Sequence, residues 1–466
     1  MADPSASNEK HVVVLGGSYG GVACVNKLLR NLSKDSNVKI TLIEKCDARY
    51  HCVASYRALV QKDFAKNLWI PYTNLFPKGS PHRIHRGLVR NIYNDHVLVA
   101  PVHDDPGESS TSSSELQRIY FDYLVIATGS AIPSPAKWTV NSSTDGLRKL
   151  DDTRNLIAQS ERIVVIGGGA CGVELSGEIK YTFPDKSVTL IHDMPALVDY
   201  PRFPESFKEE ARRYLTKQGV EVILNQRVEI EGLSRENSVQ KAERAVKLKG
   251  SDRVINSDLQ FFSIGIKVDT SFISTLEPPP DKVTPDKKAT TPFDATETLL
   301  DPKSHVIKVR PTLQLDHDAF PNIFAIGDIS NADPVPTCMA AVAAGETAAR
   351  NVIKLIRKEE KEAAGHHQRQ HHLLHHPQHD HQHLGDEAES GDRSDDETNG
   401  YNCHSWNKLE TYMPVQTMMV LAMNPTGGVS HLPVVGTWFG NLAARVAKSS
   451  DLFSGRFWRE MNMPRP

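Results

Sequence analysis

The sequence predicts an α/β fold class with two Rossmann-like dinucleotide-binding domains and a small C-terminal segment. Two stretches predict this class, because each is an apolar strand that runs through a glycine-rich turn into a helix: His11 to Val22 and Glu161 to Ile179. A third stretch, Pro321 to Ser330, is a short strand that ends in Gly-Asp at the start of a helix. Together these signals indicate two nucleotides bound face to face, which points to FAD and a nicotinamide dinucleotide.

The first glycine turn departs from the GxGxxG pattern at one position, because Ser18 stands where the middle glycine is expected. Serine is small enough to let a pyrophosphate approach the backbone at the helix N-terminus, and its hydroxyl could donate to the phosphate. We expect the whole turn to bind FAD: Gly16, Gly17, Ser18, Tyr19, Gly20 and Gly21.

The next strand, Val38 to Glu44, ends in an acid. A carboxylate at this position accepts the hydroxyls of the adenosine ribose, so we expect Glu44 to bind FAD; the alternative is a solvated strand end. Farther on, Arg57 could reach the pyrophosphate or could simply be solvated. Cys46 and Cys52 raise the alternative of a redox dithiol, although their spacing is longer than the one that disulfide reductases use.

An apolar strand that ends in Ala-Thr-Gly marks the point where a chain of this kind leaves its first domain. Here Tyr123 to Ile126 is that strand. We expect the three residues that follow it to lie at FAD: Ala127, Thr128 and Gly129.

The second glycine turn is a complete GxGxxG, in which the first glycine permits the tight turn, the second lets a pyrophosphate approach, and the third lets helix and strand pack closely. We expect it to bind NADH or NADPH through Gly167, Gly168, Gly169 and Gly172. The next strand, Ser187 to Ile191, is followed by His192, so Asp193, the acid expected at the ribose, is displaced by one position. No arginine follows before Arg202, which favours NADH and leaves NADPH open.

The third signal places Gly327 and Asp328 after a short strand. We expect Asp328 to accept the ribityl hydroxyls of FAD, with a helix N-terminus facing the second phosphate or the flavin ring. The small residues between Ala340 and Arg357 predict a helix that packs close to the cofactor.

The composition changes at Lys358. Histidines crowd between His366 and His383, an acidic run follows, and such a segment cannot bury a core. We expect a disordered insertion; the alternative is a transition-metal site made of clustered imidazoles. Order returns near Tyr412, and Val434 to Lys448 is expected to contain a helix. This last segment either packs against the body or faces a quinone or a membrane surface.

These signals divide the chain into five parts. They are the first part of an FAD-binding domain (11–135), an NAD(P)H-binding domain (151–269), the second part of the FAD-binding domain (293–357), a disordered His-rich and acidic insertion (358–410), and a C-terminal acceptor or interface segment (411–466).

The composition excludes several classes of function. The 466 residues carry a formal charge of −3 with both signs plentiful, so no specific nucleic-acid binding is expected. No apolar run approaches the roughly 20 residues that span a bilayer. Met1 to Lys10 lacks a signal-peptide pattern, and Ala2 excludes N-myristoylation. We expect a cytoplasmic protein without a bound metal, with peripheral contact to mitochondrial or lipid-droplet membranes through the C-terminal segment as an option.

The order of these motifs resembles the pyridine nucleotide-disulphide oxidoreductase-like flavoproteins, and Lys448 to Met461 resembles the C-terminal signature of their apoptosis-inducing factor-like group. The resemblance covers nearly the whole chain outside the insertion. It implies FAD at the first turn and at Arg57, Val89 and Asp328, and NAD(P)H at the second turn. It also implies that Glu174 borders the nicotinamide as the catalytic residue.

The expected activity is therefore that of an FAD-dependent NAD(P)H oxidoreductase, which passes hydride from nicotinamide to flavin and then two electrons to an acceptor, a quinone. The protein then needs only to align the rings, which suits a sequence without an acid-base triad. A type II NADH dehydrogenase is the nearest enzymatic alternative. An apoptosis-inducing factor-like death effector or redox sensor with a structural flavin is the alternative from another class. No lysine lies between Asp328 and Arg350, where relatives often carry one near the flavin.

Overall fold

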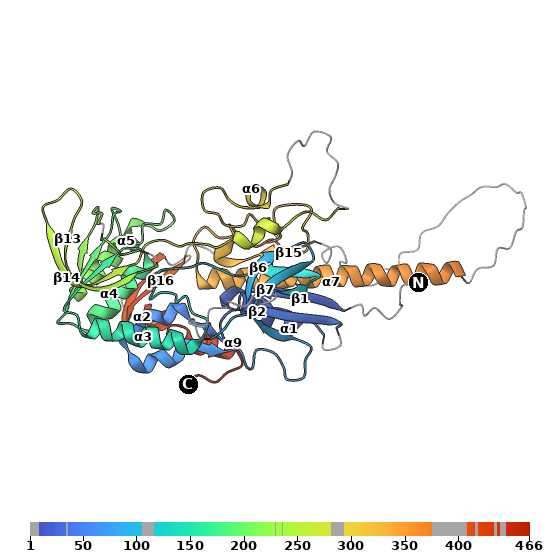
Figure 1. Ribbon diagram of the computed structural model, residues 1–466, viewed down its shortest axis with the longest axis horizontal. Helices are drawn as coiled ribbons and strands as arrows, with labels where there is room; N and C mark the ends of the chain where they lie inside the picture. The colour runs from blue at the N-terminus through green and yellow to red at the C-terminus, as the bar shows by residue number, and fades with distance from the viewer. Residues whose placement is uncertain are drawn as a thin grey trace, which may run out of the picture.

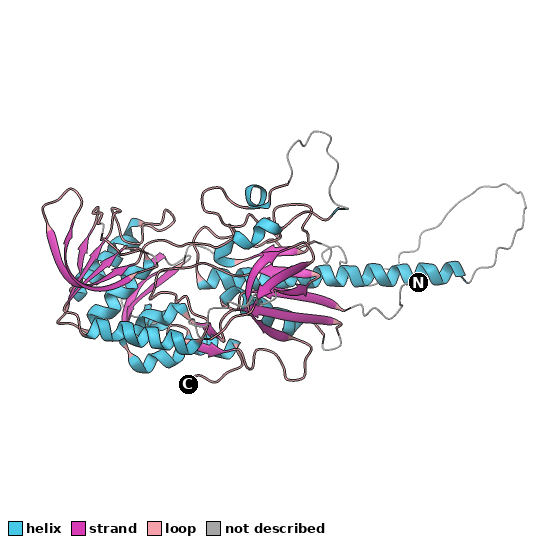
Figure 2. Ribbon diagram, viewed as in Figure 1, coloured by secondary structure: helices cyan, strands magenta, loops and turns pink. Residues whose placement is uncertain are grey.

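Two five-stranded sheets organise the molecule, and each is built around one of the two glycine turns (Figures 1 and 2). The structure is a computed structural model. It describes residues 9–33, 36–104, 116–228, 230–234, 236–280, 293–374, 408–414, 418–432, 436–438 and 444–466.

The first sheet is parallel and has the strand order β15-β9-β1-β2-β5. Its strands are β1 (Lys10–Leu15), β2 (Val38–Glu44), β5 (Arg83–Arg86), β9 (Tyr123–Ile126) and β15 (Ile323–Ala325). The central strands β1 and β9 are buried almost throughout, as expected for a parallel sheet covered on both faces. Because β15 pairs with β9, the third sequence signal returns to the sheet that carries the first glycine turn.

The second sheet has the order β12-β11-β10-β14-β13. Its strands are β10 (Arg162–Ile166), β11 (Ser187–Ile191), β12 (Glu221–Ile223), β13 (Val239–Lys247) and β14 (Val254–Phe262). All pairs are parallel except β13 with β14. Helices α3 (Ser143–Ala158), α4 (Ala170–Thr182) and α5 (Glu205–Gln218) belong to this half of the molecule.

Helix α1 (Tyr19–Asn31) packs along α7 (Cys338–Leu374), and small residues let their backbones meet. A Cβ on Gly345 would lie 2.2 Å from the carbonyl oxygen of Gly20, so the crossing point requires glycine. The small-residue helix predicted from residue 340 is therefore present beside the first glycine turn.

Helix α7 continues to Leu374 and projects from the body in Figure 1. Residues 358–374 are thus helical, contrary to the expected disorder, because their first turns are rich in the strong helix formers Lys, Glu and Ala. Glu359 also anchors the helix, since it accepts a hydrogen bond from the Tyr123 hydroxyl at 2.5 Å and pairs with Lys10 at 2.8 Å. The remainder of the predicted insertion, 375–407, lies outside the described residues.

Smaller elements complete the body. A three-stranded meander is formed by β6 (Leu88–Ile92), β7 (His96–Ala100) and β8 (Gln117–Tyr120), and a two-stranded ribbon by β3 (Ala48–Tyr50) and β4 (Trp69–Pro71). The short helices are α2 (Ser55–Val60), α6 (Ala295–Leu299) and the single turns η1 (Cys52–Ala54), η2 (Lys62–Asn67), η3 (Ser271–Thr275) and η5 (Gly327–Ile329).

The C-terminal segment is a three-stranded antiparallel sheet followed by helical turns. It contains β16 (Met419–Asn424), β17 (Gly427–Leu432), β18 (Gly436–Trp438), the π-helical turn η6 (Arg445–Ser449) and α9 (Ser454–Glu460). The helix expected within 434–448 is present only at its end, as η6, whereas residues 436–438 pair with β17 as an edge strand. Residues 439–443 lie outside the described part.

This segment contributes to the cores of both halves. Phe457, Trp458 and Met461 are buried with β1, α1 and α7, whereas Leu421 and Met423 are buried with α4 and β10. For α9, the packing alternative of the sequence prediction is therefore the one that the structure supports.

Candidate functional site

The first glycine turn is folded tightly beneath the end of β9. Gly16 has a φ of +94°, and a Cβ there would lie 2.5 Å from the Ala127 carbonyl oxygen. A Cβ on Gly21 would lie 1.9 Å from the Gly16 carbonyl oxygen. Both positions require glycine, whereas the departure at Ser18 costs nothing because that side chain is exposed.

The helix that follows each glycine turn has an open N-terminus. Ser18 before α1 and Gly169 before α4 make no side-chain capping bond, and neither helix has an acid in its first turn. By contrast, Ser142 caps α3 by accepting from the backbone N–H of Asp145, which also places an acid in that first turn. Unpaired N–H groups and the positive end of a helix dipole bind anions, so both turns fit a pyrophosphate.

One cavity collects the predicted FAD residues. Four parallel strands of the first sheet carry them, and parallel strands deliver their carboxyl ends to the same sheet edge. The predicted residues that line the cavity are Ser18, Tyr19, Gly20, Glu44, Ala127, Thr128, Gly129, Gly327 and Asp328.

Glu44 is fixed at the edge of this cavity by backbone groups. Its carboxylate accepts from the N–H of Gly17 at 2.6 Å, of Lys45 at 2.8 Å and of Cys46 at 3.1 Å. These bonds tie the end of β2 to the second residue of the turn. Glu44 therefore has a fixed carboxylate in the cavity and is not a loosely solvated strand end.

Asp328 lies on η5, and its side chain lies near Lys137, which the sequence analysis did not identify. Its carboxylate accepts from the Ser130 hydroxyl at 2.6 Å and lies 3.5 Å from the Lys137 ammonium. Lys137 also donates to the Ser130 carbonyl oxygen at 3.0 Å. The helix expected to start at Asp328 is instead the single turn η5. Helix α7 begins ten residues after Asp328, at Cys338, and its residue Ala341 packs against Gly327.

The second glycine turn repeats the geometry of the first. Gly167 has a φ of +112°, and a Cβ there would lie 2.5 Å from the Ser263 carbonyl oxygen. A Cβ on Gly172 would lie 1.8 Å from the Gly167 carbonyl oxygen. The two middle positions differ: a Cβ on Gly168 would lie 2.6 Å from the His192 ring, whereas a Cβ on Gly169 would meet only the Tyr200 hydroxyl, at 3.5 Å.

Apolar side chains stand exposed in the half of the molecule that carries this second turn. Ile264 is 41% exposed, Ile266 is 48% exposed and Met194 is 44% exposed. Ile264 follows β14 and would contact a Cβ on Gly167. Asp193 also lies here, with an exposed side chain, on the loop after β11. The structure thus brings Asp193 to the second half but does not bury it against the turn.

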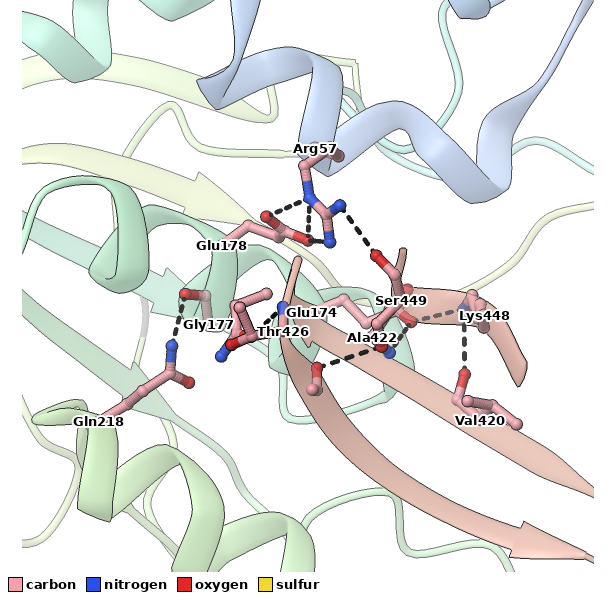
Figure 3. A network of polar contacts seen from close by, with 12 residues as sticks. Arg57, Glu174, Gly177, Glu178, Gln218, Val420, Ala422, Thr426, Lys448 and Ser449 are labelled. Atoms are coloured by element: carbon pink, nitrogen blue, oxygen red, sulfur yellow. Dashed lines mark hydrogen bonds and ion pairs between the residues drawn. The ribbon is translucent and has the colours of Figure 1, made fainter. Parts of the chain in front are cut away.

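A second cavity adjoins the first and contains Glu174. Both cavities are lined by Tyr19, Cys52, Lys137 and Asp328, so they share a wall. Helix α4 presents Glu174 to the C-terminal segment, where its carboxylate accepts from the Lys448 ammonium at 2.6 Å and from the Ala422 N–H at 2.8 Å (Figure 3).

Close backbone contact makes that arrangement possible. A Cβ on Gly177 would lie 2.6 Å from the Met423 carbonyl oxygen, so β16 crosses directly over α4. Lys448 also donates to the Val420 carbonyl oxygen at 3.0 Å. The Lys448 and Glu174 side chains are 11% and 12% exposed, so this charged pair is nearly withdrawn from water.

Arg57 and Val89 are not with the other predicted FAD residues. Arg57 lies on α2 and its guanidinium is committed to Glu178, with which it pairs at 2.6 Å, and to the Ser449 carbonyl oxygen at 3.0 Å (Figure 3). Val89 lies on β6, where it pairs with Val99 in the meander. Neither residue lines the first cavity. For Arg57, the predicted contact with the pyrophosphate is wrong, because its hydrogen-bonding capacity is used between α2, α4 and the C-terminal segment.

The cysteines do not form the redox pair considered from the sequence. Cys46 donates to Asp47, Cys52 donates to the Tyr19 hydroxyl, and both thiols are free. Burial raises the pKa of Cys46 to about 12, so it is protonated at neutral pH and is a poor nucleophile.

The sequence analysis did not identify Lys448 or Lys137 as residues of the site. No lysine lies between Asp328 and Arg350, but Lys448 brings an ammonium to the adjoining cavity from the far end of the chain. No local pattern could have identified it, because its partner Glu174 lies 274 positions away in sequence.

Among the described residues, no group of three or more His, Cys, Asp or Glu side chains could hold a metal ion. No helix in the same part of the chain is both long enough and apolar enough to cross a membrane.

Known proteins are similar to this chain in sequence. The family model for pyridine nucleotide-disulphide oxidoreductases matches residues 10–348. Ferroptosis suppressor protein 1 of Taeniopygia guttata is 30% identical over 465 residues, which cover 99% of this chain and 98% of the relative. Its human namesake is 26% identical over 464 residues, with 99% and 98% covered. Apoptosis-inducing factor homolog B of Dictyostelium discoideum is 24% identical over 474 residues, with 99% of each chain covered.

Solved structures show the same fold. NDH2 from Plasmodium falciparum in complex with NADH has a TM-score of 0.61 at 13% identity, covering 98% of this chain and 99% of that chain. The sulfide:quinone oxidoreductase of Aquifex aeolicus has a TM-score of 0.54 at 19% identity, covering 75% of this chain and 77% of that chain.

The predicted fold class, the predicted family and the two predicted cofactors are thereby confirmed. The open helix ends and the cavity described above fit the dinucleotides that such proteins use. The chain belongs to the pyridine nucleotide-disulphide oxidoreductase family, and it is an NAD(P)H-dependent flavoprotein oxidoreductase.

Proposed function

We propose that the chain is an FAD-dependent NAD(P)H:quinone oxidoreductase. When bound, FAD would accept hydride from the nicotinamide and supply two electrons to the acceptor. The acceptor class is argued from the second cavity, whose wall is mostly apolar. Its apolar side chains include Val53, Tyr56, Ile132, Ala136, Met339, Met418, Met419, Val420, Leu421 and Phe453. A flat, apolar acceptor is what such a lining accommodates.

In this function, each part of the chain has its own role. Residues 11–135 and 293–357 would together form the FAD-binding domain, and 151–269 would form the NAD(P)H-binding domain. FAD would be held by the first turn, by the Glu44 carboxylate at the ribose and by Asp328 at the ribityl chain. NAD(P)H would lie along the second turn with its nicotinamide toward Glu174. The C-terminal segment, 411–466, would complete the acceptor site.

The charged pair at the second cavity supplies the polar end of that site. Glu174 and the Val420 carbonyl oxygen hold the Lys448 ammonium in place. A fixed ammonium in a site with little water stabilises negative charge that develops on an acceptor oxygen as electrons arrive. Because Lys448 is already oriented, no reorganisation is needed at that moment.

We also propose that the C-terminal segment touches a membrane surface. On η6, Val446 is 76% exposed and lies beside the exposed Arg445, and Lys448 at the cavity follows two residues later. An apolar side chain next to a cation suits an anionic lipid surface, from which a long-tailed quinone could enter. Co-sedimentation with anionic vesicles tests this, and equal sedimentation of wild type and a Val446→Glu variant would contradict it.

Steady-state turnover tests the main proposal. Purified protein should oxidise NADH continuously with a quinone acceptor, whereas a redox sensor would be reduced once and then stall. Replacing Lys448 by methionine should lower quinone turnover at least tenfold and leave ferricyanide reduction nearly intact. Lys217→Met is the matched control, because Lys217 is exposed on α5. Unchanged quinone turnover in Lys448→Met would refute the assignment of this cavity to the acceptor.

A further inference from the structure

The two glycine turns are held in the same register against their neighbouring strands. In each, the first glycine donates its N–H to an isoleucine carbonyl oxygen on the next strand: Gly16 to Ile43 at 2.8 Å and Gly167 to Ile191 at 2.9 Å. The residue after each isoleucine therefore occupies the same place in its sheet. That residue is Glu44 in the first sheet and His192 in the second.

Both side chains also lie over the second residue of their turn. The Glu44 carboxylate accepts from the Gly17 N–H at 2.6 Å. The His192 ring covers Gly168 so closely that a Cβ on this glycine would lie 2.6 Å from the ring carbon Cδ2. Asp193 corresponds to Lys45 and points into solvent. In this register the carboxylate that a ribose would meet in the first half is replaced by an imidazole in the second.

The imidazole has hydrogen-bonding capacity to spare. Its side chain is 13% exposed, and neither ring nitrogen makes a hydrogen bond within the described part of the chain; Nδ1 lies 3.4 Å from the Asp193 carboxylate. A proton on Nδ1 would face that carboxylate, which leaves Nε2 as an acceptor. Burial lowers the pKa of His192 below its ordinary value and so favours the neutral ring.

We propose that His192 reads the 2′ position of the adenosine ribose of NAD(P)H, accepting from the 2′-hydroxyl when neutral and pairing with a 2′-phosphate when protonated. This rests on the proposed placement of NAD(P)H along the second turn. A carboxylate at this position repels a 2′-phosphate and so selects NADH. An imidazole carries no such repulsion, and therefore admits both dinucleotides.

The groups around His192 determine whether affinity for a 2′-phosphorylated ligand rises or falls with pH. The acids that face it are Asp193 and Asp199, and both favour the protonated ring. From the loop after β12, the uncharged Gln226 donates its backbone N–H to the His192 carbonyl oxygen at 3.0 Å. Protonation on lowering the pH therefore adds a positive charge that a 2′-phosphate can meet. Affinity for the 2′-phosphorylated ligand should rise from pH 8 to pH 6, relative to a variant without a titrating ring.

Binding of dinucleotide fragments tests the proposal without turnover. ADP-ribose and 2′-phospho-ADP-ribose are titrated calorimetrically into the FAD-loaded protein at pH 6 and pH 8. The variants are His192→Gln, which keeps polarity without titration, and His192→Asp, which restores a carboxylate. His85→Gln is the matched control, because burial lowers the pKa of His85 as well but this residue lies on β5 of the first sheet.

In His192→Asp, we expect 2′-phospho-ADP-ribose to bind at least tenfold more weakly while ADP-ribose binds as in the wild type. In His192→Gln, the preference for the 2′-phosphate should no longer increase at pH 6; this comparison cancels the titration of the phosphate itself, whose second pKa is about 6. A wild-type ratio of the two affinities in His192→Asp, or a wild-type pH dependence in His192→Gln, would overturn the proposal. Neither measurement involves quinone turnover. The proposal of a quinone acceptor can therefore be refuted while the role of His192 is upheld, and the role of His192 can be refuted while the quinone acceptor is upheld.

Discussion

Replacing Arg57 by leucine tests whether its guanidinium serves the fold or the cofactor. The Arg57 and Glu178 side chains are 1% and 2% exposed, and Nε of Arg57 donates to both carboxylate oxygens at 2.8 Å. A further N–H reaches the Ser449 carbonyl oxygen at 3.0 Å. The substitution would leave Glu178 buried without a cation and would detach the C-terminal segment from α2.

Removing one partner of a buried ion pair costs about 3–5 kcal/mol, mostly because the other charge is left unpaired. Burial already raises the pKa of Glu178, and the Arg57 guanidinium only partly opposes this. Without Arg57 the carboxyl takes up a proton more readily, so the loss should be about 3 kcal/mol at pH 8 and smaller at pH 5. In the folded variant, the pKa of the Glu178 carboxyl lies above its value in the unfolded chain. The destabilisation caused by the buried charge therefore decreases as the pH falls.

Urea unfolding of the variant, with flavin content measured on the same samples, checks the reasoning. The urea midpoint should fall and recover in part in Arg57→Leu/Glu178→Leu, while folded protein should retain FAD. Arg212→Leu is the control, because its ion pair on α5 is 50% and 69% exposed and worth little. A wild-type midpoint together with weakened FAD binding would refute the assignment and return Arg57 to the cofactor site.

Two other substitutions address the first cavity, and a third addresses the packing of α9. Asp328→Ala should leave ribityl hydroxyls unpaired at roughly 1–3 kcal/mol and weaken FAD binding about tenfold or more, and full yellow occupancy after dialysis would contradict this. Gly16→Val should yield folded protein without flavin, because a side chain there meets the Ala127 carbonyl oxygen and a φ of +94° disfavours it; retained FAD absorbance would show that the turn is not the pyrophosphate site. Phe457→Ala removes a fully buried ring whose centroid lies 4.8 Å from that of Tyr19, so stability should drop by about 3–5 kcal/mol, as read from thermal melts; a wild-type melting temperature would show that α9 is not part of the core.

The sequence predicted the features that local patterns encode. A strand, a glycine turn and a helix follow one another within about 30 residues in each dinucleotide-binding unit, so Gly16, Glu44 and Gly167 could be found by spacing alone. The same holds for Asp328, because the short strand before it carries the apolar pattern of a buried parallel strand.

Features that depend on pairing between distant segments could not be predicted. Arg57 contacts Glu178 and Ser449, which lie 121 and 392 positions away in sequence. The local sequence around Arg57 could not indicate these partners. The place of His192 opposite Glu44 follows from strand register, which only the folded sheets define. The extent of the helix within 434–448 could not be predicted either, because a short apolar run does not distinguish an edge strand, as at 436–438, from a helix.

The central claim, that electrons leave through the cavity beneath the C-terminal segment, is tested most directly by anaerobic stopped-flow absorbance of the flavin. Met418 lines this cavity, whereas Met413 is 76% exposed, so Met418→Trp and Met413→Trp form a matched pair. NADH should bleach the flavin of both variants at a rate close to that of the wild type. On mixing with quinone, absorbance should return at least tenfold more slowly in Met418→Trp and normally in Met413→Trp, with ferricyanide equally fast in all. Equal rates of reoxidation by quinone in the two variants would contradict the account.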